Sequence, residues 1–379
     1  MAVIGVASEG PDEARVALSP ETAKKFSGLG FAVKAPAGVG KRSNFSDALY
    51  KEAGAEIVGS DAAALSGADI VLKVGRPTAE QAASLKQGAF VAANLDPFGD
   101  KAGLEALAST GAVAFAMEFM PRITRAQSMD VLSSQANLAG YKAVVDAAAA
   151  FERAMPMMMT AAGTVPAARI FIMGAGVAGL QAIATARRMG AVVSATDVRP
   201  AAKEQVASLG AKFVAVEDEE FKQAETAAGY AKPMSEAYQK KQAELVASHI
   251  AGQDIVITTA LIPGRPAPRL VTRAMVESMK PGSIVVDLAA ERGGNCELTK
   301  PGEIVEHNGV RIMGLLNLPG RVPGNASSLY ARNLYAFIET LWDKKTKTIA
   351  INWDDEIVKG TLIARDGKIV HPSLTGEKA

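Results

Sequence analysis

The chain has 379 residues, 49% of them hydrophobic, which is long for one domain and natural for two. Its 41 Lys and Arg residues balance its 40 Asp and Glu residues, so no net charge would draw nucleic acid or a membrane surface to it. The single cysteine, Cys296, excludes a disulfide or a multi-thiolate metal site within the chain and indicates a cytoplasmic protein.

Residues 1 to about 120 alternate between short apolar runs and helical patterns. The first run, residues 3–7, lacks a preceding basic stretch and predicts a β-strand rather than a signal peptide. Ser19 and Pro20 are typical of a helix start, and Thr22 stands where a capping box usually has Glu or Gln. Strands alternating with helices predict a parallel sheet covered on both faces. The other expected strands span residues 31–34, 69–74, 88–92 and 111–115.

Two cations in this region, Arg15 and Lys73, lie at or just beyond the ends of expected elements. Ligands of α/β sheets bind at such positions. The simpler interpretation, which we favour on pattern alone, is that both are solvated surface cations.

A polar stretch at residues 121–135 precedes a long alanine-rich helical pattern at residues 131–153, the candidate connector between two α/β units. Arg122, Gln127, Asp130 and Ser133 would offer charge, amide and hydroxyl groups to a nucleotide. The alternative is an ordinary capped helix start, with Ser128 or Asp130 as the cap. The pattern alone does not choose between them.

The most specific pattern is a Gly-x-Gly-x-x-Gly turn formed by Gly174, Gly176 and Gly179. An apolar run precedes the turn, and a helical pattern and a second apolar run follow it, ending at Asp197. In such units the glycines allow a tight turn, close approach of a pyrophosphate and close helix packing. The helix N-terminus attracts the phosphates, and the carboxylate accepts from a ribose hydroxyl and repels a 2′-phosphate. The sequence therefore predicts a dinucleotide site.

The remaining elements continue the βα alternation. The charged excursion at residues 217–241 is too long for an ordinary loop and indicates a lid or a disordered stretch. A helix at residues 327–345, capped by Asn325 or Ser327, would return the chain to the first domain, and Asp366-Gly367 predicts a C-terminal hairpin. The other expected helices span residues 201–209, 235–251 and 272–279, and the other expected strands span residues 212–216, 254–260, 283–288 and 311–314.

Other chemistries find little support in the sequence. The three histidines, His249, His307 and His371, are scattered without ligand partners at helical spacing, so we expect no metal site. There is no Gly-x-Ser-x-Gly motif, and Cys296 has no nearby base. The chemistry that remains for this chain is hydride transfer with a nicotinamide cofactor. Residues 170–186 carry no charge but are too few for the roughly twenty of a membrane-spanning helix, so we expect no direct membrane insertion.

Over almost its whole length the chain resembles the NAD(H)-binding domain (domain I, α-subunit) of proton-translocating nicotinamide nucleotide transhydrogenase. The resemblance is most specific at residues 121–130, 157–166, 229–232 and 258–264. It implies an α/β fold of two Rossmann-like parallel-sheet domains joined by long helices, with NAD(H) between them. The expected domains are 1–125 with 330–379, a connector at 126–155, and a Rossmann NAD(H)-binding domain at 156–329.

The resemblance also implies roles for single residues. Gln127 would orient the dihydronicotinamide, with Arg122 and Asp130 paired in the same loop and Ser133 beside the nicotinamide. Tyr230, after Gly229, would be the tip of a loop that closes over the nucleotide, and Leu261 would lie beside it. Asp197 would hold the adenosine ribose. The nucleotide contacts around Asp197 and the turn would be Gly174, Ala175, Gly176, Val177, Gly179, Val198 and Arg199.

The family implies partners as well. We expect a homodimer that works with the NADP(H)-binding domain of a β-subunit and with membrane-spanning subunits, on the cytoplasmic face of the inner membrane. The expected reaction is direct hydride transfer between NADH and NADP, coupled to proton translocation by the membrane subunits. The chain ends before any hydrophobic continuation, which suits either a split α-subunit or a truncated chain.

Two other functions stay open. The chain also resembles alanine dehydrogenase, in which the positions of Arg15 and Lys73 hold the carboxylate substrate. The position of that enzyme's histidine is Asn94 here, which removes the proton carrier of amino-acid deamination. With this resemblance we interpret Arg15 and Lys73 as inherited structure. The third possibility is a non-catalytic NAD(H)-sensing module.

Overall fold

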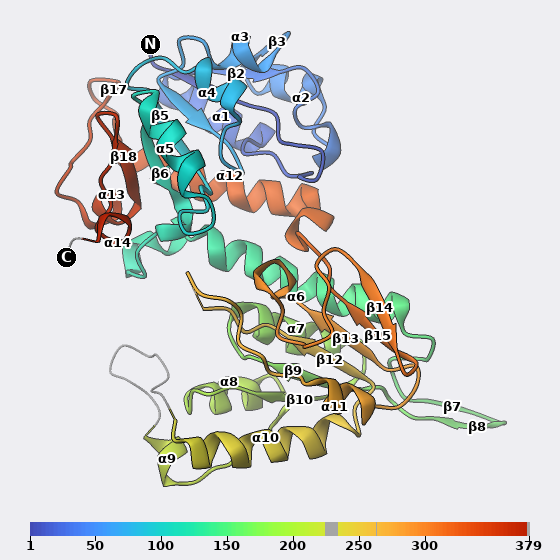
Figure 1. Cartoon of the computed structure of the whole chain (residues 1–379). Helices are drawn as coiled ribbons and strands as arrows, with labels where there is room; N and C mark the ends of the chain where they lie inside the picture. The colour runs from blue at the N-terminus through green and yellow to red at the C-terminus, as the bar shows by residue number, and fades with distance from the viewer. Residues whose placement is uncertain (224–233, 263, 377–379) are drawn as a thin grey trace. The chain divides into compact units, whose positions relative to one another are not determined.

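The computed structural model describes residues 1–223, 234–262 and 264–376. They form two compact units, each built on its own sheet (Figure 1). Unit 1 comprises Met1–Gln135 and Gly320–Ala379, and unit 2 comprises Ala136–Pro319. The two-sheet α/β fold expected from the sequence is confirmed.

The sheet of unit 1 has the strand order β19-β18-β6-β5-β4-β1-β2-β3. The six strands from β1 to β6 are parallel to their neighbours, and β18 closes one side antiparallel to β6. The sequence pattern predicts each of these parallel strands except β3. Its strands are β1 (Val3–Val6), β2 (Ala32–Pro36), β3 (Ala55–Val58), β4 (Ile70–Leu72), β5 (Phe90–Ala93), β6 (Val113–Ala116), β18 (Leu362–Arg365) and β19 (Lys368–Ile369).

Most helices of unit 1 start where a short polar side chain, Ser, Thr or Asp, caps them. Ser19 caps α1, and its partner in a reciprocal capping box is the Thr22 hydroxyl, which replaces the usual Glu or Gln. The helices are α1 (Pro20–Leu29), α2 (Asp47–Glu52), α3 (Asp61–Leu65), α4 (Ala79–Ala83), α5 (Lys101–Ser109), α12 (Pro323–Thr340), α13 (Glu356–Thr361) and α14 (Pro372–Thr375). A small ribbon of β16 (Trp342–Asp343) and β17 (Thr348–Ile349) follows α12.

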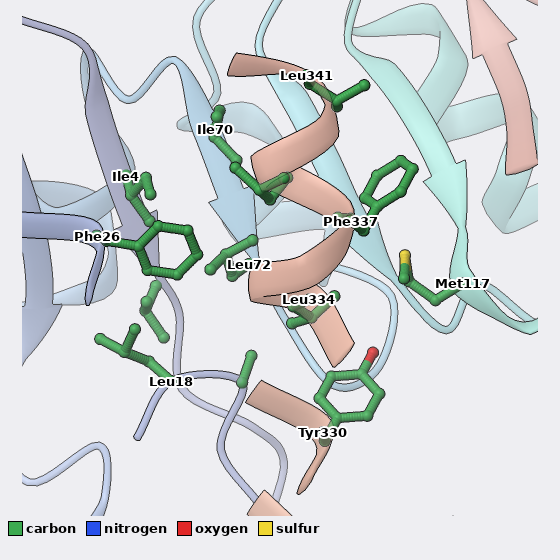
Figure 2. Packing of buried hydrophobic residues seen from close by; sticks show 14 of the residues in the cluster. Ile4, Leu18, Phe26, Ile70, Leu72, Met117, Tyr330, Leu334, Phe337 and Leu341 are labelled. Carbon is green, nitrogen blue, oxygen red and sulfur yellow. The ribbon is translucent and has the colours of Figure 1, made fainter. Parts of the chain in front are cut away.

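The core of unit 1 forms around α12, although that helix comes more than 200 residues after the strands it covers. Figure 2 shows Leu334 and Phe337 of α12 packed among buried side chains that include Ile70 and Leu72 of β4. Burying a large apolar side chain contributes about 1.5–3 kcal/mol, so α12 is integral to this unit.

The start of α12 corrects one expectation. The helix begins at Pro323 in the first position, not at a cap on Asn325 or Ser327, and it ends at Thr340. Ser327 lies inside the helix, where its buried hydroxyl accepts from the Val16 N–H at 2.9 Å and pairs with the Ser43 hydroxyl. Proline at this position loses no helical hydrogen bond, which explains the earlier start.

The C-terminal hairpin is confirmed, with Asp366 and Gly367 both at positive φ in its turn. The segment before it, Glu356–Thr361, forms α13 and buries Ile357 and Val358. Among the described residues, no helix is both long and apolar enough to cross a membrane.

Unit 2 has the strand order β11-β10-β9-β12-β13-β15-β14, parallel except for β14. The central strands are continuous apolar runs, such as Ile-Val-Ile-Thr in β12, because helices cover both faces. The strands are β9 (Arg169–Met173), β10 (Val192–Thr196), β11 (Lys212–Phe213), β12 (Ile255–Thr258), β13 (Ile284–Asp287), β14 (Ile304–His307) and β15 (Val310–Met313). The helices are α6 (Val131–Ala150), which begins in unit 1, α7 (Val177–Arg188), α8 (Ala202–Ser208), α9 (Glu219–Lys222), α10 (Glu236–Ile250) and α11 (Arg273–Glu277).

A two-stranded hairpin that the sequence analysis did not anticipate follows α6. β7 (Met158–Thr160) pairs antiparallel with β8 (Gly163–Val165), and the hairpin extends away from the body of unit 2 (Figure 1). Every residue of both strands is exposed, including Met158, Met159 and Val165. An apolar hairpin without a core face of its own is typical of a segment that packs against another chain.

Candidate functional site

The glycine turn between β9 and α7 has the geometry that its sequence predicts. Gly174 has φ +110°, and a side chain there would lie 2.4 Å from the Thr259 hydroxyl. A Cβ on Gly179 would lie 1.8 Å from the Gly174 carbonyl oxygen, so only glycine lets α7 start this close to β9. A Cβ on Gly176 would meet nothing within 4 Å. A side chain therefore cannot fit at Gly174 or Gly179. We call the turn open at Gly176, because no protein atom would contact a side chain there.

Asp197 follows β10 and reaches back to the turn. Its Oδ2 accepts from the Ala175 N–H at 2.7 Å, and its Oδ1 accepts from the Arg199 N–H and the Arg199 Nε–H, both at 2.9 Å. The Asp197 side chain is 8% exposed and that of Arg199 33%. The carboxylate thus links the glycine turn to the loop after β10, while Val198 between them is exposed.

Exposed apolar side chains gather after three neighbouring strands of this sheet. Val177 follows β9, Val198 follows β10, and Leu261 and Ile262 follow β12. In the strand order β10-β9-β12, the chain reverses its direction of progress between β9 and β12. Crevices at such a reversal, outside the carboxyl ends of the strands, are where α/β sheets bind ligands.

Asn295, which the sequence analysis missed, supports the segment after β12. Its buried side chain accepts from the Ala260 N–H at 3.0 Å and donates to the Ala260 and Pro268 carbonyl oxygens at 2.9 and 2.8 Å. It therefore holds both ends of the stretch that carries Leu261. No local sequence pattern indicates this role, because Pro268 and Ala260 lie 27 and 35 residues away from Asn295 in the chain.

Asp287 at the end of β13 is fully buried and holds the loop that carries Asn295. Its carboxylate accepts from the Thr258 hydroxyl at 3.1 Å, the Thr299 hydroxyl at 2.6 Å, and the Ala289 and Cys296 N–H groups. A buried carboxylate with four donors has its hydrogen bonds satisfied, so its role here is structural.

The polar stretch before α6 belongs to unit 1 and contains the short 3-10 helix η3 (Thr124–Met129). Ala126 and Met129 pack into the core, whereas Arg122 and Gln127 are exposed. Asp130 caps α6: its carboxylate accepts from the Ser133 N–H at 2.9 Å and from the Ser133 hydroxyl at 2.6 Å. The helix start capped by Asp130 is therefore confirmed, and the Gln127 side chain before it is exposed to solvent.

Two contacts from distant residues hold this stretch in place. Asn333 on α12 donates to the Ser128 carbonyl at 2.8 Å, and its Oδ1 accepts from the Ser134 hydroxyl at 2.7 Å. Arg125 forms a bidentate pair with Asp355 at 2.7 and 2.8 Å. The chain is thus anchored on both sides of Gln127, and neither anchor could be read from local sequence.

Lys73 and Arg15, at the carboxyl edge of the unit 1 sheet, are not the solvated surface cations that the sequence pattern indicated. Lys73 is 2% exposed, and its ammonium donates to Glu9 Oε2 at 2.5 Å. The Arg15 guanidinium donates to both oxygens of Glu13 and to Gln135 Oε1 at 2.8 Å. Each cation is neutralised by a carboxylate of the same unit, as buried charges require.

Glu118 and Asn94 lie at the same edge of unit 1. Glu118 Oε1 accepts from the Leu95 and Asp96 N–H groups, whereas Glu118 Oε2 and Asn94 Oδ1 are buried without a hydrogen-bond partner in the described part of the chain. Burial raises the pKa of the Glu118 carboxyl to about 7. This carboxyl is therefore held largely in its neutral form at mildly acidic pH.

The structure thus assembles the expected residues in two groups. Gly174, Ala175, Gly176, Val177, Gly179, Asp197, Val198, Arg199 and Leu261 lie on unit 2, and Arg122, Gln127, Asp130 and Ser133 lie on unit 1. Gly229 and Tyr230 fall outside the described residues. Within the described ranges, no three His, Cys, Asp or Glu side chains are grouped to hold a metal ion.

Comparison with known proteins identifies the family. Residues 5–139 match Alanine dehydrogenase/PNT, N-terminal domain, and residues 143–372 match Alanine dehydrogenase/PNT, C-terminal domain. The chain is 56% identical over 374 residues to an NAD(P) transhydrogenase subunit alpha chain of Rhodospirillum rubrum, covering 97% of each chain. It is 29% identical to the alanine dehydrogenase of Halomonas elongata, over 96% of this chain and 92% of that one.

Solved structures agree with this relationship. A transhydrogenase from Sinorhizobium meliloti has a TM-score of 0.89 and 58% identity, covering 98% of this chain and 100% of that one. An L-alanine dehydrogenase has a TM-score of 0.81 at 23% identity, covering 99% and 98%, which shows a shared fold. The chain belongs to the Alanine dehydrogenase/PNT family and is an enzyme subunit of the NAD(P) transhydrogenase type.

Proposed function

We propose that unit 2 binds NAD(H) and that the chain catalyses direct hydride transfer between NADH and an NADP held by a partner subunit. The observation that carries this proposal is the open glycine turn, with Asp197 beside it, at the reversal of strand order between β9 and β12.

The residues at this edge suit a dinucleotide. The space at Gly176 admits a pyrophosphate next to the start of α7, where the first N–H groups of a helix have no acceptor within the helix itself. Asp197 offers a carboxylate to the adenosine ribose. The exposed Val177, Val198 and Leu261 supply apolar contact for the rings. Tyr230, after Gly229, would close over the nucleotide.

Bound NADH supplies a hydride from its dihydronicotinamide C4 to C4 of the NADP nicotinamide, which leaves NAD⁺ and NADPH. No substrate proton is removed, so this chain needs no general base. Its residues must hold the donor ring at near-attack distance, about 3–3.5 Å, from the acceptor ring. We assign that orientation to Gln127, with Arg122, Asp130 and Ser133 shaping the loop that presents it.

The proposal extends to the assembly. We infer that two copies form a homodimer and that the β7–β8 hairpin, with its exposed Met158, Met159 and Val165, packs against the second copy. The dimer would work with the NADP(H)-binding domain of the β-subunit and with membrane-spanning subunits, on the cytoplasmic face of the inner membrane. Those subunits would couple the reaction to proton translocation.

Reconstitution tests the proposal. The isolated chain should bind NADH, bind NADPH weakly and show little activity. Adding the NADP(H)-binding domain of the partner should start hydride transfer from NADH to NADP⁺, followed by absorbance with a thionicotinamide analogue of NADP⁺. A chain that binds no NADH, or that no partner domain activates, would rule the proposal out.

Substitution of Gln127 separates catalysis from nucleotide sensing. Gln127→Asn should reduce the transfer rate by at least about tenfold, because the ring is no longer held at the right distance, while NADH affinity stays within about threefold. The matched control is Gln87→Asn, another exposed glutamine of unit 1, which should leave both unchanged. Equal effects of the two changes would favour a sensing module.

An amino-acid dehydrogenase remains the second candidate, because the fold is shared with alanine dehydrogenase. Lys73 and Arg15 already have carboxylate partners within unit 1. The side-chain amide of Asn94 does not ionise, so it cannot carry a proton to or from a substrate. A direct assay with alanine and NAD⁺, and with pyruvate, ammonia and NADH, decides this question. Turnover without any partner would overturn our assignment.

A further inference from the structure

We propose that Gly140 on α6 is a positioning residue for nucleotide binding. It holds the first turn of α7 in the place where the N–H groups of that turn meet the pyrophosphate. The inference rests on the proposed binding of a dinucleotide at the glycine turn. It goes beyond that proposal, because Gly140 lies on another helix and well before the Gly-x-Gly-x-x-Gly pattern in the chain.

The contact between α6 and α7 at Gly140 is made by backbone atoms. A Cβ on Gly140 would lie 2.0 Å from the carbonyl oxygen of Ala178 and 2.8 Å from its carbonyl carbon. Gly140 is buried, and Ala178 belongs to the first turn of α7, which begins at Val177. A carbon atom and a carbonyl oxygen normally stay about 3.3 Å or more apart, so only glycine lets the two helices lie this close.

A hydrogen bond on the same faces of the two helices accompanies this contact. Asn137 Nδ2 donates to Gln181 Oε1 at 3.2 Å. Asn137 and Gly140 have i, i+3 spacing on α6, and Ala178 and Gln181 have the same spacing on α7, so each pair shares one helix face. The start of α7 is therefore attached to α6 by two neighbouring contacts.

The first turn of α7 is confined from two sides. Gly179 lets the turn lie against the Gly174 carbonyl oxygen, and Gly140 lets it lie against α6. The first N–H groups of a helix have no acceptor within the helix, and a hydrogen bond to a phosphate oxygen needs a donor–acceptor distance of about 2.7–3.2 Å. The direction of these N–H groups therefore depends on both glycines.

A side chain at position 140 would move this turn. Ala143 and Ala147 bury α6 in the core of unit 2, whereas the first turn of α7 borders the open space at Gly176. The turn is therefore the part that yields, by roughly 1 Å if a normal carbon–oxygen distance is to be restored. A shift of that size is enough to lose hydrogen bonds to a bound phosphate.

A purely structural role for Gly140 predicts a different result. A glycine that only lets two helices pack would lower stability when it is substituted, and the protein that still folds would bind every ligand as before. A positioning role predicts weaker binding of ligands that carry the pyrophosphate and unchanged binding of a ligand that lacks it.

The test uses the full chain with ADP and with adenosine, which share the adenosine group and differ in the pyrophosphate. Calorimetric titration measures the dissociation constants, and thermal unfolding shows which variants are folded. Gly140→Ala should bind ADP and NADH at least about tenfold more weakly and adenosine within about twofold of the unmodified chain.

Asn137→Ala keeps the test decisive if Gly140→Ala does not fold. This change removes only the hydrogen bond to Gln181 and introduces no overlap, since Asn137 is exposed. The start of α7 then loses one of its two contacts with α6. We expect about threefold weaker binding of ADP and unchanged binding of adenosine.

Two variants serve as matched controls. Ala147→Gly removes a buried methyl group from α6 and displaces no neighbour, so it should lower stability and leave all three affinities within about twofold. Gly28→Ala makes the same change as Gly140→Ala within α1, where the added Cβ would meet nothing within 4 Å. It should alter no affinity.

The inference is overturned if the folded variants at Gly140 and Asn137 bind ADP as the unmodified chain does. It is also overturned if adenosine loses as much affinity as ADP, or if Ala147→Gly weakens ADP binding as much as Gly140→Ala. An unmodified chain that binds neither ADP nor NADH contradicts the proposed function instead, so the two failures are distinguishable.

Discussion

The two units share one strand order but use its reversal point in opposite ways. In unit 1 the order β3-β2-β1-β4-β5-β6 reverses between β1 and β4, and in unit 2 the order β11-β10-β9-β12-β13-β15 reverses between β9 and β12. Glu9, which follows β1, fills the reversal of unit 1 by accepting from Lys73 and from the Val74 N–H. The same place in unit 2 holds a glycine turn that is open at Gly176.

The difference shows that the same edge of one fold can either be filled by a side chain of the chain itself or be left clear for a ligand. A long side chain after the first strand brings its own anion to the cations and N–H groups of the edge. Glycines after the first strand supply no such side chain, so the space at Gly176 beside the start of α7 stays clear for an external anion. We therefore expect changes at the edge of unit 1 to alter stability and changes at the edge of unit 2 to alter binding.

The largest effect should come from breaking the buried ion pair of unit 1. Glu9→Gln leaves the Lys73 ammonium buried without its anion, which costs about 3–5 kcal/mol in comparable pairs. Denaturant unfolding should register this loss, while the folded protein should bind 5′-AMP with unchanged affinity. Weakened nucleotide binding by the folded variant would break the comparison.

Glu118 should make the edge of unit 1 sensitive to pH. Its folded pKa of about 7 lies above its usual value of 4.5 because burial disfavours the charge. The neutral form therefore stabilises the fold fully below pH 4.5, and this contribution is lost as pH rises through 7. Relative to Glu118→Gln, the unmodified chain should lose about 3 kcal/mol by pH 8. Unfolding curves at pH 4 and pH 8 measure the difference, and parallel shifts at both would contradict it.

In unit 2, Gly179→Ala should damage both folding and binding. The added Cβ would lie 1.8 Å from the Gly174 carbonyl oxygen, a backbone atom that cannot move without opening the turn. We expect a loss of about 1–3 kcal/mol in stability. NADH titration of the remaining folded protein should show affinity reduced by at least about tenfold. Normal binding would mean that the turn does not belong to the site.

Gly176→Ala is the matched change at the open glycine, and its effect should be the smallest. Its Cβ would meet no protein atom within 4 Å, and its φ of −74° suits alanine. Stability should stay within about 0.5 kcal/mol of the unmodified chain. NADH should still bind about tenfold more weakly, because the methyl group enters the space proposed for the pyrophosphate. Unchanged affinity would remove the pyrophosphate from this place.

The sequence alone determined the features that depend on neighbours in the chain. The Gly-x-Gly-x-x-Gly turn, Ser19 as a cap, the Asp366-Gly367 hairpin and the apolar parallel strands follow from backbone sterics and local periodicity. Only the tertiary structure decided the partners of the buried charges and amides. Glu9 meets Lys73 across 64 residues, and Asn333 meets Ser128 across 205. Such contacts leave no local pattern because folding, not spacing, brings their partners together. For the same reason the sequence pattern indicated surface cations at Arg15 and Lys73, because only the folded chain brings Gln135 to Arg15 and Glu9 to Lys73.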